Sequence, residues 1–295
     1  MTLVIKDYYS DSTHWNGVQP RGTDIVIASC YKAGTTLTQQ IVNLLINGNS
    51  DFYNFNSLHK ISPRIELVSD PQFDSLEAKL NHVNNLPAPR FFKSHLPFEA
   101  LPYYPEWKYI YLVRDGRDVA LSLYNMAGGY DTRFWEIQVK GSFIEFWDEW
   151  LETGAHLWSF WENMNSWWKV RHLPNVLFVH YSNLTNEKLK EIERIAKFLN
   201  LEIDTERTEI VLQQSSLAYM KENWEKFQPP GFRPQGFFAQ GKNGLWQELL
   251  TPERVEKYEK MSCEKLGIEY ANWIKNGGDL SILLEPAAAE PTSQS

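Results

Sequence analysis

The stretch TDIVIASCYKAGTTLTQQIVNLLI, residues 23–46, sets the fold class of this 295-residue chain. A short apolar run leads into a loop that contains lysine, glycine and two threonines, and helical periodicity follows over 35–46. A strand that turns directly into a helix presents backbone N–H groups and the positive end of the helix dipole to an anion. The pattern therefore favours a phosphate-binding turn, with an ordinary strand–turn–helix and a capping threonine as the alternative.

The residues of this loop suit phosphate binding in different ways. Gly34 lets the backbone approach an anion closely, Thr35 and Thr36 add hydroxyl donors, and Lys32 supplies a full charge. The loop is not a Walker A motif, because the order GxxxxGK(S/T) is absent and the lysine precedes the glycine. In that motif the Ser or Thr after the lysine holds magnesium, so the sequence predicts phosphate binding without a metal.

Short β-branched or aromatic runs elsewhere are typical of buried strands, and helical patterns lie between and after them. The predicted strands are 24–28, 90–94, 108–113 and 175–181. The predicted helices are 35–46, 63–69, 75–83, 116–126, 143–168 with a weak point at Gly154, 187–199, 205–213 and 252–265. This alternation predicts an α/β fold with a mainly parallel sheet covered on both faces. No linker divides 20–275, so we expect one domain over 1–285 and a disordered tail over 286–295.

The composition excludes several functional classes. The chain has 29 basic and 37 acidic residues, a net charge of −8, and no Lys/Arg-rich block, which argues against a nucleic-acid partner. The two cysteines are too few for a disulfide framework. The first residues lack a signal-peptide pattern, and no apolar run approaches the ~20 residues that span a bilayer. We therefore expect a cytoplasmic protein without a membrane span.

Seven segments, in order, resemble the cytosolic-type sulfotransferases that use 3′-phosphoadenylyl sulfate (PAPS). The YKAGTT turn is similar to that family's PKSGTT, and FFKSHLP (91–97) is similar to its strand-borne K-T-H-L-P. The other segments are ISPRIEL (61–67), YIYLVRDGRDVALSLY (109–124), SWWKVRHLPNVLFVHYSNL (166–184), SSLAYMKEN (215–223) and GKNGLW (241–246). The resemblance implies a P-loop-like fold, PAPS as donor, 3′,5′-ADP as product, and a small-molecule hydroxyl or amine acceptor.

The resemblance and the chemistry together assign catalytic roles. His95, at the carboxyl end of a strand, is the expected base for the acceptor proton. Lys32 is expected to bind the 5′-phosphate and to follow charge onto the leaving oxygen. Lys93, two residues before His95, faces the same way on a strand and is expected to assist there, although it also fits a solvated strand-end lysine.

The donor site predicted by the resemblance extends beyond the turn. Arg114 and Ser122 match the 3′-phosphate ligands, and a guanidinium suits a phosphate well. Tyr181, Ser215 and Leu217 match positions around adenine, although all three also fit as packing residues. The full predicted set is Lys32, Ala33, Gly34, Thr35, Thr36, Leu37, Arg114, Ser122, Tyr181, Ser215, Leu217, Gly241 and Lys242. Arg117 and Asp118 are expected to be structural.

The chain departs from the family pattern at three places. Leu37 stands where relatives carry a tryptophan. The closing R-K-G reads Ala239-Gln240-Gly241, and Lys242 or Arg233 could compensate for the missing cations. The dimerisation pattern retains only Thr251 and Glu256, so the usual dimer is not expected.

The acceptor side is marked by aromatic residues. Seven of the twelve tryptophans fall within 135–168. At helical spacing such residues are usually core, with acceptor-pocket lining as the alternative, and either role favours an apolar acceptor.

Two other functions compete with sulfuryl transfer. A nucleoside-triphosphate phosphotransferase would need the absent Walker order, and a catalytically silent nucleotide-binding relative would fit the altered Ala239-Gln240 loop.

Overall fold

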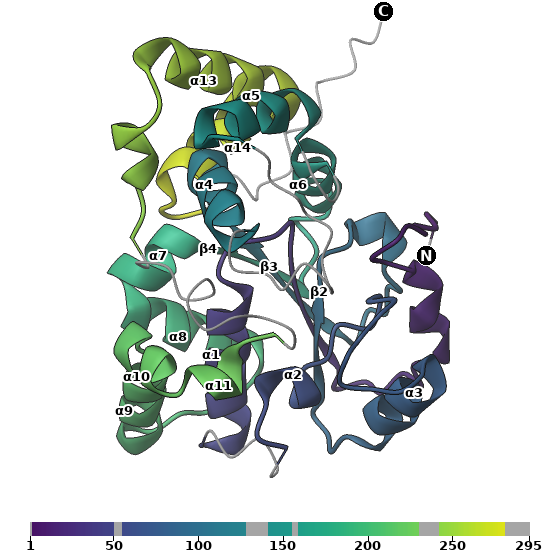
Figure 1. Cartoon of the computed structure of the whole chain (residues 1–295). Coiled ribbons are helices and arrows are strands. Elements are labelled where there is room, and N and C mark those ends of the chain that lie inside the picture. The colour runs from purple at the N-terminus through teal and green to yellow at the C-terminus, as the bar shows by residue number, and fades with distance from the viewer. Residues whose placement is uncertain (1, 50–54, 128–140, 155–158, 230–241, 281–295) are drawn as a thin grey trace, which may run out of the picture.

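A computed structural model describes residues 2–49, 55–127, 141–154, 159–229 and 242–280 (Figure 1). Its centre is a four-stranded sheet in the order β2-β1-β3-β4, with every neighbouring pair parallel. The strands are β1 (Ile25–Ser29), β2 (Phe91–Ser94), β3 (Lys108–Val113) and β4 (Val176–His180). All four lie where the sequence predicts them. The single parallel α/β domain is confirmed.

Most predicted helices are also confirmed. They are α1 (Thr35–Asn47), α3 (Leu76–Asn85), α4 (Gly116–Ala127), α8 (Lys188–Phe198), α9 (Thr205–Gln214) and α13 (Pro252–Leu266). The predicted helix over 143–168 is divided into α5 (Phe143–Thr153) and α6 (Phe160–Trp168). Gly154 adopts a φ of 69° and caps α5, which explains the weak point in the pattern.

One predicted helix is wrong. Residues 63–69 form a turn with isolated bridges instead of a helix. Arg64 forms an isolated backbone bridge with Lys93 of β2, and Leu67 forms one with Ser10. The Lys93 N–H donates to the carbonyl of Pro63 at 3.1 Å. These long-range backbone contacts outweigh the helical spacing of the apolar residues.

Several short elements were not predicted. They are the helices α2 (Leu58–Ile61), α7 (Tyr181–Asn186), α10 (Leu217–Glu222) and α11 (Trp224–Phe227), and the 3₁₀ turns η1 (Ser12–Gly17), η3 (Phe98–Ala100) and η4 (Leu245–Glu248). The nine-residue α14 (Ile268–Asn276) was also missed. It packs against α13 at the end of the described chain (Figure 1).

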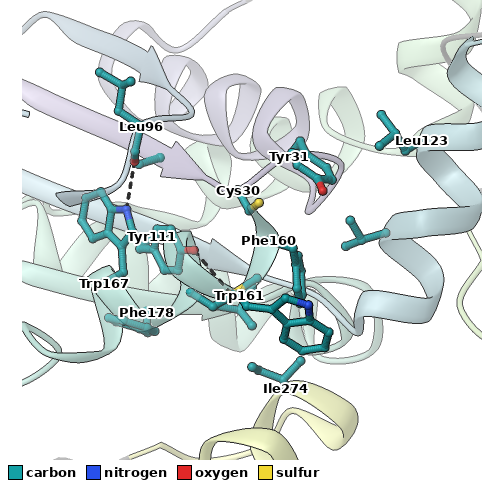
Figure 2. Packing of buried hydrophobic residues seen from close by; sticks show 14 of the residues in the cluster. Cys30, Tyr31, Leu96, Tyr111, Leu123, Phe160, Trp161, Trp167, Phe178 and Ile274 are labelled. Carbon is teal, nitrogen blue, oxygen red and sulfur yellow. Dashed lines mark hydrogen bonds between the residues drawn. The ribbon is translucent and has the colours of Figure 1, made fainter. Parts of the chain in front are cut away.

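The sheet separates two apolar cores of different composition. Alternate residues of β1 point to opposite faces, so Val26 enters one core and Ile27 the other. The core with Ile27 is mostly aliphatic and packs against α1, α8 and α9. The core with Val26 is rich in aromatic rings from α5, α6, α13 and α14. Figure 2 shows part of it, with the rings of Tyr111, Phe160, Trp161, Trp167 and Phe178.

The tryptophan-rich segment belongs to this aromatic core. Trp147, Trp150 and Trp167 are fully buried, and Trp161 is nearly so. Trp168 stacks on Tyr270 with ring centroids 3.9 Å apart. Core packing is therefore the role of these five. Trp135 and Trp158 lie outside the described residues, as does the predicted tail over 286–295.

Candidate active site

The predicted phosphate turn lies directly after β1, at the carboxyl edge of the sheet. Lys32 and Gly34 adopt positive φ angles of 52° and 97°, and α1 begins at Thr35. A Cβ on Gly34 would lie 2.6 Å from the ring of Tyr181, so only glycine fits between the turn and α7. The turn thus brings together the first N–H groups of α1, the Lys32 side chain and the Tyr181 ring.

His95 follows β2 and lies beside the end of β1. Its Nδ1 is 3.0 Å from the carbonyl oxygen of Ser29 and 3.3 Å from the Ser29 hydroxyl, which in turn lies 2.7 Å from the Thr35 hydroxyl. A carbonyl oxygen only accepts hydrogen bonds, so Nδ1 carries the proton and Nε2 keeps its lone pair. The Nε2 of His95 is therefore the ring nitrogen that can accept a proton.

Electrostatics keep this imidazole neutral. Burial, and then the positive charges of Lys93 and Arg64, hold the pKa of His95 well below its usual range. Around neutral pH the ring is thus in the basic form that proton abstraction requires.

Two lysines share the same environment. Burial, and then the charges of Lys93 and Arg114, lower the pKa of Lys32 to about 7, and its Nζ lies 3.1 Å from the sulfur of Met126. Burial, and then the charge of Arg64, lower the pKa of Lys93 to about 8. Positive charges that lie close together disfavour each other's protonation, and an anion among them would raise these pKa values again. The cluster fits a ligand with several negative charges.

Arg114 follows β3 and joins the phosphate turn to the closing segment. Its guanidinium lies 4.4 Å from the centre of the Tyr181 ring. It donates to the carbonyl of Lys32 at 3.2 Å, to that of Lys242 at 3.3 Å and to Asn243 Oδ1 at 3.0 Å. Ser122 lies further along α4 and is half-buried.

The closing segment is held by residues outside the predicted donor set. Asn243 Nδ2 donates to Ser182 Oγ at 3.0 Å, and Gly244 N–H donates to Asp118 at 2.9 Å. Asp118 therefore has a structural role, as expected. Arg117 does too, because it donates to Asp115 and Glu259. Gly241 and Arg233 lie outside the described residues.

The other predicted donor residues make contacts of a different kind. Ser215 ends α9, and its hydroxyl donates to the carbonyl of Val211 at 2.5 Å. Leu217 begins α10 and is 40% exposed. Leu37 packs against the aliphatic core. A role in donor binding stays a prediction for each of them.

Sequence reasoning missed three residues around His95: Ser29, Glu66 and Asn163. Glu66 accepts the backbone N–H of His95 at 2.9 Å, and Asn163 donates to the His95 carbonyl at 3.0 Å. Glu66 lies inside the ISPRIEL segment, but the helix predicted there concealed its contacts. The sequence around Asn163 gives no indication of its contact with His95, because the two residues lie 68 positions apart in the chain.

Among the described residues, no cluster of three or more His, Cys, Asp or Glu side chains could hold a metal ion. Within the same ranges, no helix is long and apolar enough to cross a membrane.

The fold and the site define a class of protein: a parallel α/β protein with a strand–helix turn of the phosphate-binding type and a neutral histidine near it. Residues 22–268 match the sequence model of the sulfotransferase domain. The chain belongs to the sulfotransferase family, and the expectation of a PAPS-dependent sulfotransferase is confirmed at the level of the enzyme class.

Similar proteins with curated names agree. The chain is 28% identical over 273 residues to mouse sulfotransferase 1 family member D1, covering 88% of this chain and 90% of that protein. It is also 28% identical over 276 residues to human sulfotransferase 1E1, covering 88% of each.

Solved structures share the fold. A retinol dehydratase in complex with retinol and PAP superposes with a TM-score of 0.70 at 24% identity, covering 86% of this chain and 84% of that one. A mouse sulfotransferase, SULT7A1, complexed with PAP gives a TM-score of 0.72 at 19% identity, covering 90% and 92%.

Proposed function

We propose that this enzyme transfers the sulfuryl group of PAPS to a hydroxyl or amine of a small, apolar acceptor, with His95 as general base. The observation that carries the proposal is the Nδ1 contact with the Ser29 carbonyl at 3.0 Å. It leaves Nε2 as the basic nitrogen at the edge of the sheet where the phosphate turn lies. A base must be within hydrogen-bond reach of the proton it removes, and its protonation state must suit the pH.

The proposed step balances as an in-line displacement. The acceptor oxygen or nitrogen forms a bond to sulfur while its proton passes to Nε2 of His95. The bond between sulfur and the bridging oxygen breaks, and its electron pair stays on the 5′-phosphate of 3′,5′-ADP. Lys32, and Lys93 beside it, stabilise the charge that develops on these oxygens.

The donor is proposed to occupy the turn and its surroundings. Lys32 and the Ala33–Thr36 backbone hold the 5′-phosphate, while Arg114 and Ser122 hold the 3′-phosphate. Tyr181, Ser215 and Leu217 surround the adenine, and Leu37, Gly241 and Lys242 complete the pocket. The lowered pKa values of Lys32 and Lys93 support a polyanionic ligand, because they result in part from like charges that such a ligand neutralises. The PAP bound in two of the structural neighbours supports the same ligand.

An apolar acceptor is supported by the aromatic core next to His95 and by the neighbours. Retinol and androsterone are the ligands of two retinol dehydratase structures with the same fold. We further propose that the protein is cytoplasmic and that transfer needs no metal.

A direct assay tests the proposal. The folded protein is incubated in EDTA with labelled PAPS and a panel of phenols, alcohols and amines, both apolar and charged. We expect sulfated product from apolar members and binding of 3′,5′-ADP by calorimetry. Binding without product from any acceptor would favour a catalytically silent relative. Binding that appears only when magnesium is added would contradict donor recognition without a metal.

A further inference from the structure

The peptide of His95 is held on both sides by buried polar side chains. Its N–H donates to Glu66 Oε1 at 2.9 Å, and its carbonyl accepts from Asn163 Nδ2 at 3.0 Å. The next carbonyl, that of Leu96, accepts from the Trp167 indole at 3.1 Å (Figure 2). Since β2 ends at Ser94, these bonds replace the sheet hydrogen bonds that would otherwise fix this part of the backbone.

Glu66 is a fully buried carboxylate that collects donors from separate parts of the chain. Besides the His95 N–H, Oε1 accepts from Arg64 Nε at 2.9 Å and from Ser94 Oγ at 3.2 Å. Its Oε2 accepts from the Trp15 indole at 3.3 Å. A buried carboxylate with four donors is held in one position, and so is any group bonded to it.

Part of this support comes from residues before the segment that matches the family. Trp15 lies in η1, and Ser10 accepts from Arg64 Nη2 at 2.7 Å. The family match begins at residue 22. The amino-terminal segment therefore contributes to the network that holds His95.

Asn163, which belongs to α6, holds the carbonyl side of the His95 peptide. It is 2% exposed, and its Oδ1 accepts from the hydroxyl of Tyr111 at 2.7 Å, which orients the amide so that Nδ2 faces the His95 carbonyl. Tyr111 belongs to β3 and stacks on Trp167, with ring centroids 4.6 Å apart. The aromatic core thus supports the peptide that carries the base.

We propose that Glu66 and Asn163 are positioning residues, which clamp the His95 peptide and thereby aim its imidazole at the acceptor. The proposal rests on the proposed role of His95 as the base. Glu66 and Asn163 act through bonds to the His95 backbone. A small displacement of the general base can lower the rate of transfer strongly, because the base must lie within hydrogen-bond distance of the proton that it removes.

The chain offers a matched control for each variant. Asn175 is also buried, and its amide donates to two backbone carbonyls, those of Tyr104 at 3.2 Å and Trp107 at 3.1 Å. Glu191 is also buried, and Arg194 donates to both of its oxygens at 3.2 and 2.6 Å. These contacts involve none of the residues that hold His95.

The experiment compares Asn163→Ala with Asn175→Ala, and Glu66→Gln with Glu191→Gln. For each folded variant we measure kcat, acceptor KM, 3′,5′-ADP affinity and melting temperature. We expect Asn163→Ala and Glu66→Gln to lower kcat by about ten- to a hundredfold with donor affinity nearly unchanged. The controls should lose melting temperature with little change in kcat. Equal kcat in variant and control, at equal loss of stability, would overturn the proposal.

A second readout does not depend on turnover. Long-range ¹H–¹⁵N NMR reports the tautomer of His95, and the signal missing from His95→Ala assigns its ring among the seven histidines. We expect the Nδ1–H tautomer in the native protein and in Asn175→Ala, and a mixture in Asn163→Ala. An unchanged tautomer in Asn163→Ala would contradict the clamp even if the protein is active. Normal turnover in His95→Ala would instead overturn the proposed base and leave this spectroscopic test intact.

Discussion

The aromatic core and the cationic edge of the sheet are built in opposite ways. In the aromatic core Trp147, Trp150 and their neighbours pack ring against ring, with centroids 5.5 Å apart for this pair. At the cationic edge Lys32 and Lys93 are placed where burial and like charges disfavour their protonated forms. Packing in the aromatic core stabilises the folded protein. The partly buried lysines at the cationic edge destabilise it until an anionic ligand neutralises their charges. The difference separates the residues that hold the fold from those that we propose carry out the chemistry.

The largest effect on stability is expected in the aromatic core. Trp147→Ala removes a fully buried side chain and should lower the free energy of unfolding by about 3–5 kcal/mol. Denaturant titration measures the loss, and calorimetry with 3′,5′-ADP measures what remains of the site. If the variant does not fold, Trp147→Phe gives a smaller loss in the same direction. A large loss of donor affinity in a well-folded variant would show that the two regions are not separate.

At the cationic edge the expected result is the reverse. Arg114→Ala should weaken binding of 3′,5′-ADP by about 1.5–3 kcal/mol, because a charged hydrogen-bond partner is lost. Adenosine 5′-phosphosulfate lacks the 3′-phosphate and should bind the variant and the native protein about equally. Since Arg114 also donates to Lys32 and Asn243, a general role in loop structure is the alternative. An equal loss of affinity for both nucleotides would favour that alternative.

A smaller effect is expected on the number of protons that the enzyme takes up when the donor binds. In the free protein the pKa of Lys32 is about 7, so this lysine is largely neutral at pH 8 and charged at pH 6. A phosphate beside it raises the pKa, so donor binding should take up a proton at pH 8 and little at pH 6. Calorimetry of 3′,5′-ADP binding in buffers of different ionisation enthalpy measures this uptake. Lys32→Arg keeps its charge throughout and should remove that part of the uptake; an unchanged uptake in Lys32→Arg would assign the proton to another group.

Much of this architecture was predictable from sequence. The four strands are short runs whose side chains are nearly all buried, so composition alone marks them. The strand–turn–helix at residues 25–47 was predictable because glycine, lysine and two threonines between a strand and a helix form a local pattern, and its binding of a phosphate stays a prediction. Lys32, His95 and Arg114 follow three neighbouring strand ends, and parallel strands bring such residues together.

The support of the site was not predictable in the same way. The apolar spacing over 63–69 predicts a helix around Glu66. That spacing contains no information about Lys93 or Ser10, which pair with the segment in the structure. Asn163 sits among tryptophans whose pattern indicates only a buried face. Short helices such as α2 and α11, with four residues each, are too short to show a period. Side-chain contacts between distant segments require the fold itself.

The most direct test of the account is the paired measurement on His95→Ala. The donor is proposed to be held by Lys32, the Gly34–Thr36 turn, Arg114 and Ser122, whereas His95 acts only when the acceptor proton leaves. We predict that turnover falls by about 10²–10⁴-fold, while the affinity for 3′,5′-ADP, measured on the same folded preparation, stays nearly unchanged. Near-normal turnover in His95→Ala, with an acceptor that the native enzyme uses, would contradict the account.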